Sequence, residues 1–151
     1  MNTFVTGKKI NMKKLIFLLL LTNLLLGCSD DGFNNNNPFI PNIRFSANIN
    51  IDLPSFSDLN FGGNSIYVPP QIGGVRGLII FNSGSGFFAY DAACPNQAIT
   101  SCSTLVTNGG INAVCPCDDE SYNLFTGLST LEYPLKRYRV EVNLPIIRVY
   151  N

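Results

Sequence analysis

Short apolar segments separated by turn residues run through the chain from about residue 43 to its last residue. Between Ile43 and Ile51 every second residue is apolar, a period typical of a half-buried β-strand. Further apolar segments predict strands at residues 65–68, 77–82, 87–91, 111–115, 121–125, 135–142 and 146–150. Ser83-Gly84-Ser85-Gly86 is a hairpin-turn signal, and no stretch has a convincing helical period. The pattern therefore predicts an all-β domain over residues 42–151, closed as a small antiparallel sandwich or barrel.

The first 27 residues have a different pattern, a single apolar run behind two lysines. Lys13 and Lys14 precede the run at residues 15–21, which resumes at residues 24–26 and ends at Gly27-Cys28. A positive start, a short apolar middle and a small residue before the cleavage point are typical of a secretory signal peptide. The run is too short for a permanent membrane-spanning helix. Residues 1–27 are therefore predicted to be a signal peptide.

Leu25-Leu26-Gly27-Cys28 resembles a bacterial lipobox, in which the cysteine receives acyl chains such as palmitate and becomes the new N-terminus. The resemblance implies lipidation at Cys28 and a place in the bacterial cell envelope, with Ser29 fitting delivery to the outer membrane. The alternative is an ordinary signal peptide cut nearby, with Cys28 an unpaired thiol. Residues 28–41 are rich in Asn, Asp and Pro, and this composition predicts a flexible tether.

Removal of the signal peptide changes the charge of the chain. The whole sequence is neutral, with 10 basic and 10 acidic residues, but four lysines precede Cys28. The remaining part has a net charge of −4 and lacks the basic patch that nucleic acid binding requires. We therefore expect the lipid bilayer as partner, through the anchor, and an unidentified envelope protein or ligand.

The chain contains no histidine, which excludes Ser-His-Asp and Cys-His catalytic arrangements. Asp118-Asp119-Glu120 could bind a hard cation through oxygen, but a solvated acidic loop is the more common meaning of such a run. Cys115-Pro116-Cys117 lacks the helix and the spacing of a thioredoxin-like motif. We therefore expect no enzyme activity and no metal site.

The cysteine motifs and the strands around them resemble a Rieske domain. Cys94-Pro95-Asn96 stands where such domains have Cys-x-His, and Cys115-Pro116-Cys117-Asp118 stands where they have Cys-Pro-Cys-His. The resemblance extends over most of residues 77–149. Its other parts are Gly77–Phe81, Phe88–Asp91, the Tyr122–Gly127 strand and glycine turn, Pro134-Leu135, and Tyr138–Val140. It implies a Rieske-like β fold with a cysteine-loop sub-lobe.

In the family, two cysteines bind one iron of a 2Fe–2S cluster and two histidines bind the other. Here Asn96 and Asp118 replace both histidines, so a cluster is not expected. The resemblance then implies disulfides Cys94–Cys115 and Cys102–Cys117, although four cysteines allow three pairings. An exported domain meets the oxidising conditions in which such bonds form.

These observations predict a membrane-anchored lipoprotein with a degenerate Rieske-like domain, no cofactor and a non-catalytic binding or structural role in the envelope. The first alternative is electron transfer through a 2Fe–2S cluster. The second is a thiol–disulfide redox protein that uses Cys115 or Cys117.

Overall fold

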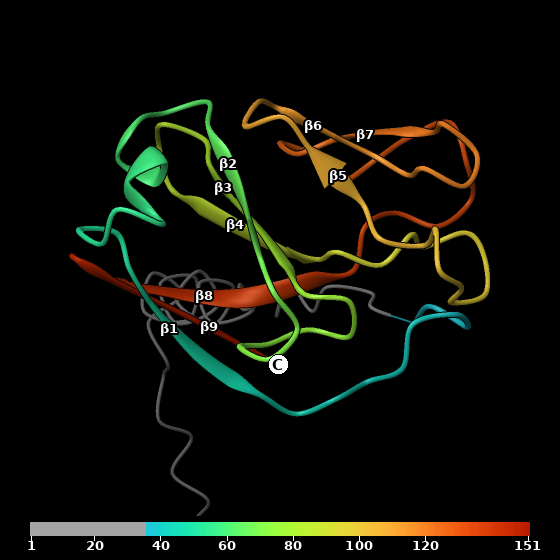
Figure 1. Cartoon of the computed structure of the whole chain (residues 1–151), viewed down its shortest axis with the longest axis horizontal. Helices are drawn as coiled ribbons and strands as arrows, with labels where there is room; N and C mark the ends of the chain where they lie inside the picture. The colour runs from blue at the N-terminus through green and yellow to red at the C-terminus, as the bar shows by residue number, and fades with distance from the viewer. Residues whose placement is uncertain (1–35) are drawn as a thin grey trace, which may run out of the picture. The chain divides into compact units, whose positions relative to one another are not determined.

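The computed structural model describes residues 36–151, which form the body shown in Figure 1. The predicted signal peptide, the lipidation site Cys28 and the first part of the predicted tether lie outside the described residues. The elements of the described part are β1 (Ser46–Asn50), the 3-10 helix η2 (Ser57–Asn60), β2 (Ser65–Val68), β3 (Leu78–Asn82), β4 (Phe87–Asp91), β5 (Val106–Thr107), β6 (Asn112–Val114), β7 (Ser121–Asn123), β8 (Arg137–Asn143) and β9 (Ile146–Tyr150). No helix within residues 36–151 has the length and apolar character needed to cross a membrane.

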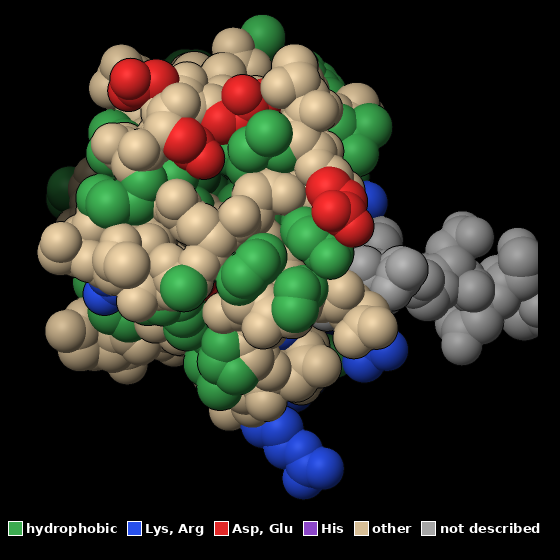
Figure 2. Space-filling view, turned by 90° about the vertical axis from the view of Figure 1, so that its right-hand side faces the viewer, with side chains coloured by type: hydrophobic (Ala, Val, Ile, Leu, Met, Phe, Trp, Pro, Cys, Tyr) green, Lys and Arg blue, Asp and Glu red, His purple; other side chains and the backbone are tan. Residues whose placement is uncertain are grey.

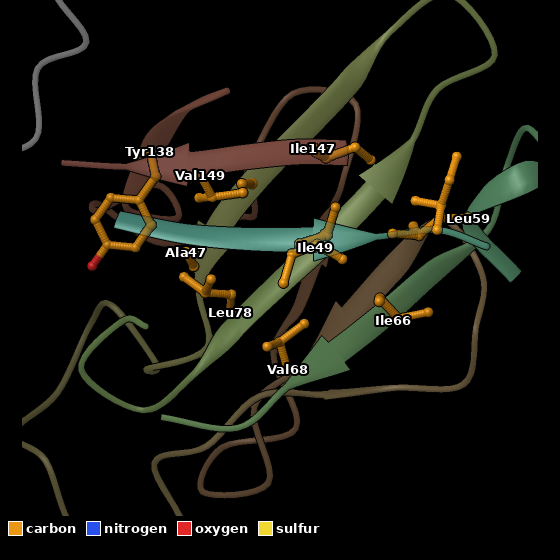
Figure 3. Close-up of a cluster of buried hydrophobic side chains, with 12 residues drawn as sticks. Ala47, Ile49, Leu59, Ile66, Val68, Leu78, Tyr138, Ile147 and Val149 are labelled. Carbon is orange, nitrogen blue, oxygen red and sulfur yellow. The ribbon is translucent and has the colours of Figure 1, made fainter. Parts of the chain in front are cut away.

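The larger sheet has six antiparallel strands in the order β1-β9-β8-β4-β3-β2. It is strongly curled, because side chains from both of its edge strands meet in one buried cluster (Figure 3). Ala47 and Ile49 of β1 and Ile66 and Val68 of β2 all belong to this cluster. The period-two pattern that starts at Ile43 thus supplies the inner face of a half-barrel.

Strand β3 is buried on both faces. Leu78 and Ile80 pack inside the half-barrel, whereas Ile79 and Phe81 belong to a second buried cluster on the outer face. All four side chains have no exposed surface. Burial on both sides explains why β3 is a continuous apolar run rather than an alternating one.

The second cluster lies between the half-barrel and a small lobe, which carries the three-stranded sheet β5-β6-β7. Ala113 of β6 and Tyr122 of β7 are fully buried in this cluster. Gly127, just after this sheet, has φ 75°, and a Cβ there would lie 3.1 Å from Cε1 of Tyr90. The glycine lets the chain turn closely over the Tyr90 ring.

The predicted all-β fold class is confirmed: the described chain forms a half-barrel sheet and a smaller cysteine-bearing lobe. The bounds of β2, β4 and β9 agree with the predicted ones. The predicted strand at 121–125 ends early, at Asn123, because the Asn123 side chain accepts a hydrogen bond from Phe125 N (2.9 Å). Strand β5 was not predicted, since it has only two residues within a polar stretch.

The packed domain begins before residue 42, where we expected the flexible tether to end. Oδ1 of Asn37 accepts hydrogen bonds from Phe39 N (2.8 Å) and Ile40 N (3.1 Å), and Ile40 is only 1% exposed. The ring of Phe39 meets that of Tyr133 edge-on, with centroids 6.0 Å apart. Part of the segment assigned to the tether thus packs against the domain, and composition alone does not reveal such docking contacts.

Candidate functional site: the two cysteine loops

The first cysteine loop starts from Asp91, a fully buried carboxylate at the end of β4. Its Oδ1 accepts from Ala93 N (2.7 Å) and its Oδ2 from the Tyr138 hydroxyl (2.7 Å). The N–H groups of Val75 and Arg76 also donate to it, at 2.5 and 3.3 Å. A buried anion needs several such donors to offset its lost hydration. Asp91 therefore fixes the base of the loop against two other segments.

Backbone hydrogen bonds then close this loop. Cys94 N donates to Ser103 O (3.1 Å), and Leu105 N donates to Ala92 O (2.7 Å). Residues 95–102 lie between these bonds, and residues 98–102 form the exposed part of the loop.

The second cysteine loop is a tight turn between β6 and β7. Cys115 N donates to Glu120 O and Asp119 N donates to Cys115 O, both at 2.9 Å. Asp119 has φ 58°, the left-handed conformation that Asp tolerates better than most residues. Thr130 donates to Oε1 of Glu120 from its N–H and its hydroxyl, both at 2.8 Å, and these bonds lower the pKa of Glu120. The turn is thus fixed to the loop that follows β7.

Two disulfides join the loops: Cys94–Cys115, with Cα atoms 5.7 Å apart, and Cys102–Cys117, with Cα atoms 5.2 Å apart. These are the pairs implied by the resemblance. The two bonds have different surroundings. Cys94 and Cys115 are 1% and 0% exposed and belong to the second buried cluster. Cys102 is exposed and Cys117 is half-buried. We call Cys94–Cys115 the inner disulfide and Cys102–Cys117 the outer disulfide.

Asn96 uses both ends of its amide in hydrogen bonds to other parts of the lobe. Its Nδ2 donates to Tyr133 O (2.8 Å) and to the Tyr122 hydroxyl (2.9 Å), and its Oδ1 accepts from Tyr133 N (2.8 Å). The side chain thus joins the first cysteine loop to the loop before β8.

Asp118 is exposed, and its carboxylate turns back on its own loop. Its Oδ1 accepts a hydrogen bond from Glu120 N (3.1 Å), a local bond that supports the turn.

These donors do not fit the second iron of a Rieske cluster. The chain has no histidine, the Asn96 amide is a weak ligand already bonded at both ends, and Asp118 is a hard carboxylate. The four loop cysteines are in disulfides and offer no thiolate. Between residues 36 and 151 no group of three His, Cys, Asp or Glu side chains is placed to hold a metal ion.

The start of the described chain is attached beside these loops. Asn37 Nδ2 donates to Pro95 O (2.8 Å), next to Cys94. Lys136, only 2% exposed, donates from Nζ to Ile40 O (3.2 Å), Pro41 O (3.0 Å) and Asn42 Oδ1 (2.6 Å). Burial lowers the pKa of Lys136, and the Asp91 carboxylate acts in the opposite direction. The segment that enters the domain therefore docks at its cysteine-loop end.

Sequence reasoning identified the cysteines, Asn96 and Asp118, but missed Asn37, Asp91 and Lys136. The sequence does signal that Asp91 is buried, since this carboxylate stands between an apolar strand and two alanines. The bond from Asn37 to Pro95 O and the bonds of Lys136 have no such signal, because these partners are far away in the sequence.

Comparison with known proteins gives likenesses in structure only. No protein-family model and no curated protein matches this chain. One similar solved structure is a chain of the complex of reduced oxygenase and oxidized ferredoxin in carbazole 1,9a-dioxygenase: identity 21%, TM-score 0.45, covering 73% of this chain and 94% of that one. Another is the ferredoxin of carbazole 1,9a-dioxygenase from Nocardioides aromaticivorans IC177: identity 16%, TM-score 0.45, coverage 72% and 97%.

A third similar structure is a putative NADH-dependent nitrite reductase small subunit from Mycobacterium tuberculosis. Its identity is 15%, its TM-score is 0.44, and the coverage is 73% of this chain and 97% of that one. With identities below 25% and TM-scores below 0.5, these likenesses assign no function to the chain.

Proposed function

We propose that this protein is a lipid-anchored envelope protein whose Rieske-like domain holds disulfides in place of an iron–sulfur cluster. Its role is non-catalytic, as a binding or structural module. The observation that carries the proposal is the pair Asn96 and Asp118 at the two imidazole positions of a chain without histidine. The bonded state of the four loop cysteines supports it as well.

The disulfides suit a structural role that a metal would otherwise fill. Both bonds join the first cysteine loop, after β4, to the second, between β6 and β7. Closing a loop of about 20 residues in this way stabilises a domain by about 3 kcal/mol. The lobe's small sheet has strands of only two or three residues, so it depends on such cross-links.

The contact surface that we propose is the tip of the cysteine loops, which faces the viewer in Figure 2. Ile99 and Leu131 are 38% and 42% exposed, and Pro116 is exposed between Cys115 and Cys117 in the sequence. Asp118, Asp119 and Glu132 are exposed near them in the sequence. Figure 2 shows apolar side chains in the middle of this face and acidic ones around its upper part. Such a surface favours a partner with an apolar centre and basic residues on the side that meets the acidic part of this face.

Electron transfer through a cluster is the weaker candidate, because the ligands for the second iron are missing. A thiol–disulfide role that uses Cys115 is also disfavoured, because this residue is fully buried. A role for Cys117 has a specific observation in its favour, the exposure of its partner Cys102.

The anchor is tested by expressing the full-length chain, Cys28→Ala and the matched control Ser29→Ala in bacteria fed a palmitate label. We expect label and membrane association in the parent chain and in Ser29→Ala, and neither in Cys28→Ala. Membrane association that survives Cys28→Ala would contradict a lipid anchor at this cysteine.

The contact surface is tested by placing a photo-crosslinking residue at Ile99, or at Phe61 as control. Phe61 is 66% exposed and directly follows η2, at the other end of the body in Figure 1. We expect a defined adduct in living cells from position 99 and none from position 61. Equal yields from the two positions would contradict the assignment of the tip.

A further inference from the structure

We propose that the outer disulfide Cys102–Cys117 is an exchange site for an external dithiol, while the inner disulfide Cys94–Cys115 stays closed. This inference goes beyond the proposed function and does not depend on the lipid anchor. It rests on the unequal access to the two bonds and on the hydroxyl groups around one of them.

Access separates the two disulfides. Thiol–disulfide exchange needs a thiolate to reach a sulfur atom, so a bond inside a packed cluster reacts only when the cluster opens. The inner sulfurs belong to residues that are 1% and 0% exposed, and Gln97 Nε2 also donates to Cys115 Sγ (3.2 Å). Cys102 is exposed, so the outer bond can be attacked at this sulfur in the folded chain.

Two hydroxyl groups lie next to the outer bond. Thr100 Oγ1 is 3.3 Å from Cys102 Sγ and 3.8 Å from Cys117 Sγ, and Ser103 Oγ is 3.8 Å from Cys117 Sγ. The Ser103 hydroxyl also donates to Ala98 O (3.1 Å), and Thr100 Oγ1 lies 2.9 Å from Ser103 Oγ, so the Thr100 proton is directed to Ser103 Oγ in the closed state. Thr100 is nevertheless the hydroxyl that lies near both sulfurs, and its proton can turn to a thiolate when one forms. A hydrogen bond to the departing thiolate stabilises it and speeds its release. The exposed Asp118 and Asp119 oppose this effect, but water screens their charge.

The exchange has two steps. A thiolate of the external dithiol attacks Cys102 Sγ, which forms a mixed disulfide and breaks the Cys102–Cys117 bond. Cys117 leaves as a thiolate and takes up a proton. The second thiol of the reagent then attacks the reagent sulfur that is bonded to Cys102. This closes the disulfide of the reagent and releases Cys102, which also takes up a proton. In total the chain gains two electrons and two protons, and the external dithiol is oxidised to a disulfide.

The lobe keeps other connections when the outer bond is open. The inner disulfide still joins the two cysteine loops, Asn96 still bonds Tyr133, and Cys94 N still donates to Ser103 O. We therefore expect a reversible reaction within the folded domain. Reduction changes only the exposed part of the first loop, at residues 98–102.

The first test treats the full-length chain, purified under air, with dithiothreitol over a range of concentrations under native conditions. Free thiols are alkylated, and peptides are identified by mass spectrometry. We expect alkylation of Cys102 and Cys117 at least tenfold faster than of Cys94 and Cys115, with an unchanged near-ultraviolet spectrum. Alkylation of all four cysteines together, or of none before the chain unfolds, would overturn the proposal.

The second test compares Thr100→Val, Thr100→Ser and Thr104→Val. Loss of the Thr100 hydroxyl should slow reduction of the outer bond about three- to tenfold, and the serine variant should restore the rate. Thr104 belongs to the same segment, in a bridge with Ala93, and its valine variant should react like the parent chain. If the Thr100 hydroxyl only held the loop in place, Thr100→Val would loosen the loop and speed the reduction. Equal or faster reduction in that variant would therefore reject the role of this hydroxyl.

Discussion

Asn96 and Tyr133 form a pair in which one side-chain amide bonds both polar groups of one backbone residue. Asn96 Nδ2 donates to Tyr133 O and Asn96 Oδ1 accepts from Tyr133 N, each at 2.8 Å. The amide carries a donor and an acceptor at once, and this arrangement uses both. The Asn96 side chain thus joins the first cysteine loop directly to the loop before β8.

The first prediction concerns this pair. Asn96→Ala leaves the partly buried N–H and C=O of Tyr133 without their partners, which costs about 2 to 3 kcal/mol. We expect that decrease in the free energy of unfolding, measured by urea denaturation of the oxidised chain. Asn112→Ala, at an exposed position on β6, is the matched control and should change it by less than about 0.5 kcal/mol. Equal losses in the two variants would show that the Asn96 bonds add nothing specific.

The second prediction concerns the docking of residues 37–42. Lys136→Met fills a similar volume but removes the three hydrogen bonds from Nζ to Ile40 O, Pro41 O and Asn42 Oδ1. We expect the free energy of unfolding to fall by about 2 kcal/mol and a protease to cut this segment faster. Arg139→Met, at an exposed position on β8, is the control. Unchanged cleavage in Lys136→Met would mean that Lys136 does not hold the segment.

The third prediction concerns alkaline pH. Burial and the neighbouring Asp91 carboxylate raise the pKa of Tyr138, whose hydroxyl donates to Asp91 Oδ2 at 2.7 Å. Its contribution to stability is complete below the pKa of an unfolded tyrosine, about 10, and is lost as the pH rises above that value. The parent chain should lose stability progressively as the pH rises above about 10 toward the raised pKa of Tyr138, and Tyr138→Phe should lose less.

The measurement is urea denaturation at several pH values, with Tyr67→Phe as control. Tyr67 is 42% exposed, and its variant should follow the parent chain. A parallel decline of Tyr138→Phe and the parent would contradict the role given to Tyr138.

The fourth prediction separates the two disulfides by stability. Their sequence separations are 21 and 15 residues, so the loop-closure entropies differ by only about 0.3 kcal/mol. Both cysteines of the inner pair lie within the second buried cluster, whereas in the outer pair the half-buried Cys117 only packs against it and Cys102 is exposed. Replacing Cys94 and Cys115 by Ser should therefore cost at least about 2 kcal/mol more than replacing Cys102 and Cys117. Equal losses in the free energy of unfolding, measured by denaturation of the two double variants, would show that loop-closure entropy alone explains what both bonds contribute.

Sequence reasoning reached the all-β class, most strands and the two cysteine pairs, because each has a local or motif signal. The run Leu78–Phe81, for example, is continuous and apolar because it is buried on both faces. Strand β5 was missed, since two residues in a polar stretch carry no period.

The contacts of Lys136 were missed for a different reason. This side chain bonds Ile40 O across 96 residues, and nothing in the neighbourhood of either residue signals the contact. Contacts from side chain to distant backbone depend on the folded path of the chain, and the local pattern of residues does not determine that path.

The central claim is that disulfides occupy the place of the cluster in the two cysteine loops. The most direct test is the iron and acid-labile sulfide content of the full-length chain, purified without air, with the state of its loop cysteines read by alkylation. We predict neither iron nor sulfide, and Cys94 and Cys115 protected from alkylation until the chain is reduced and unfolded. Two irons and two labile sulfides per chain, with a loss of both on oxidation, would contradict the account.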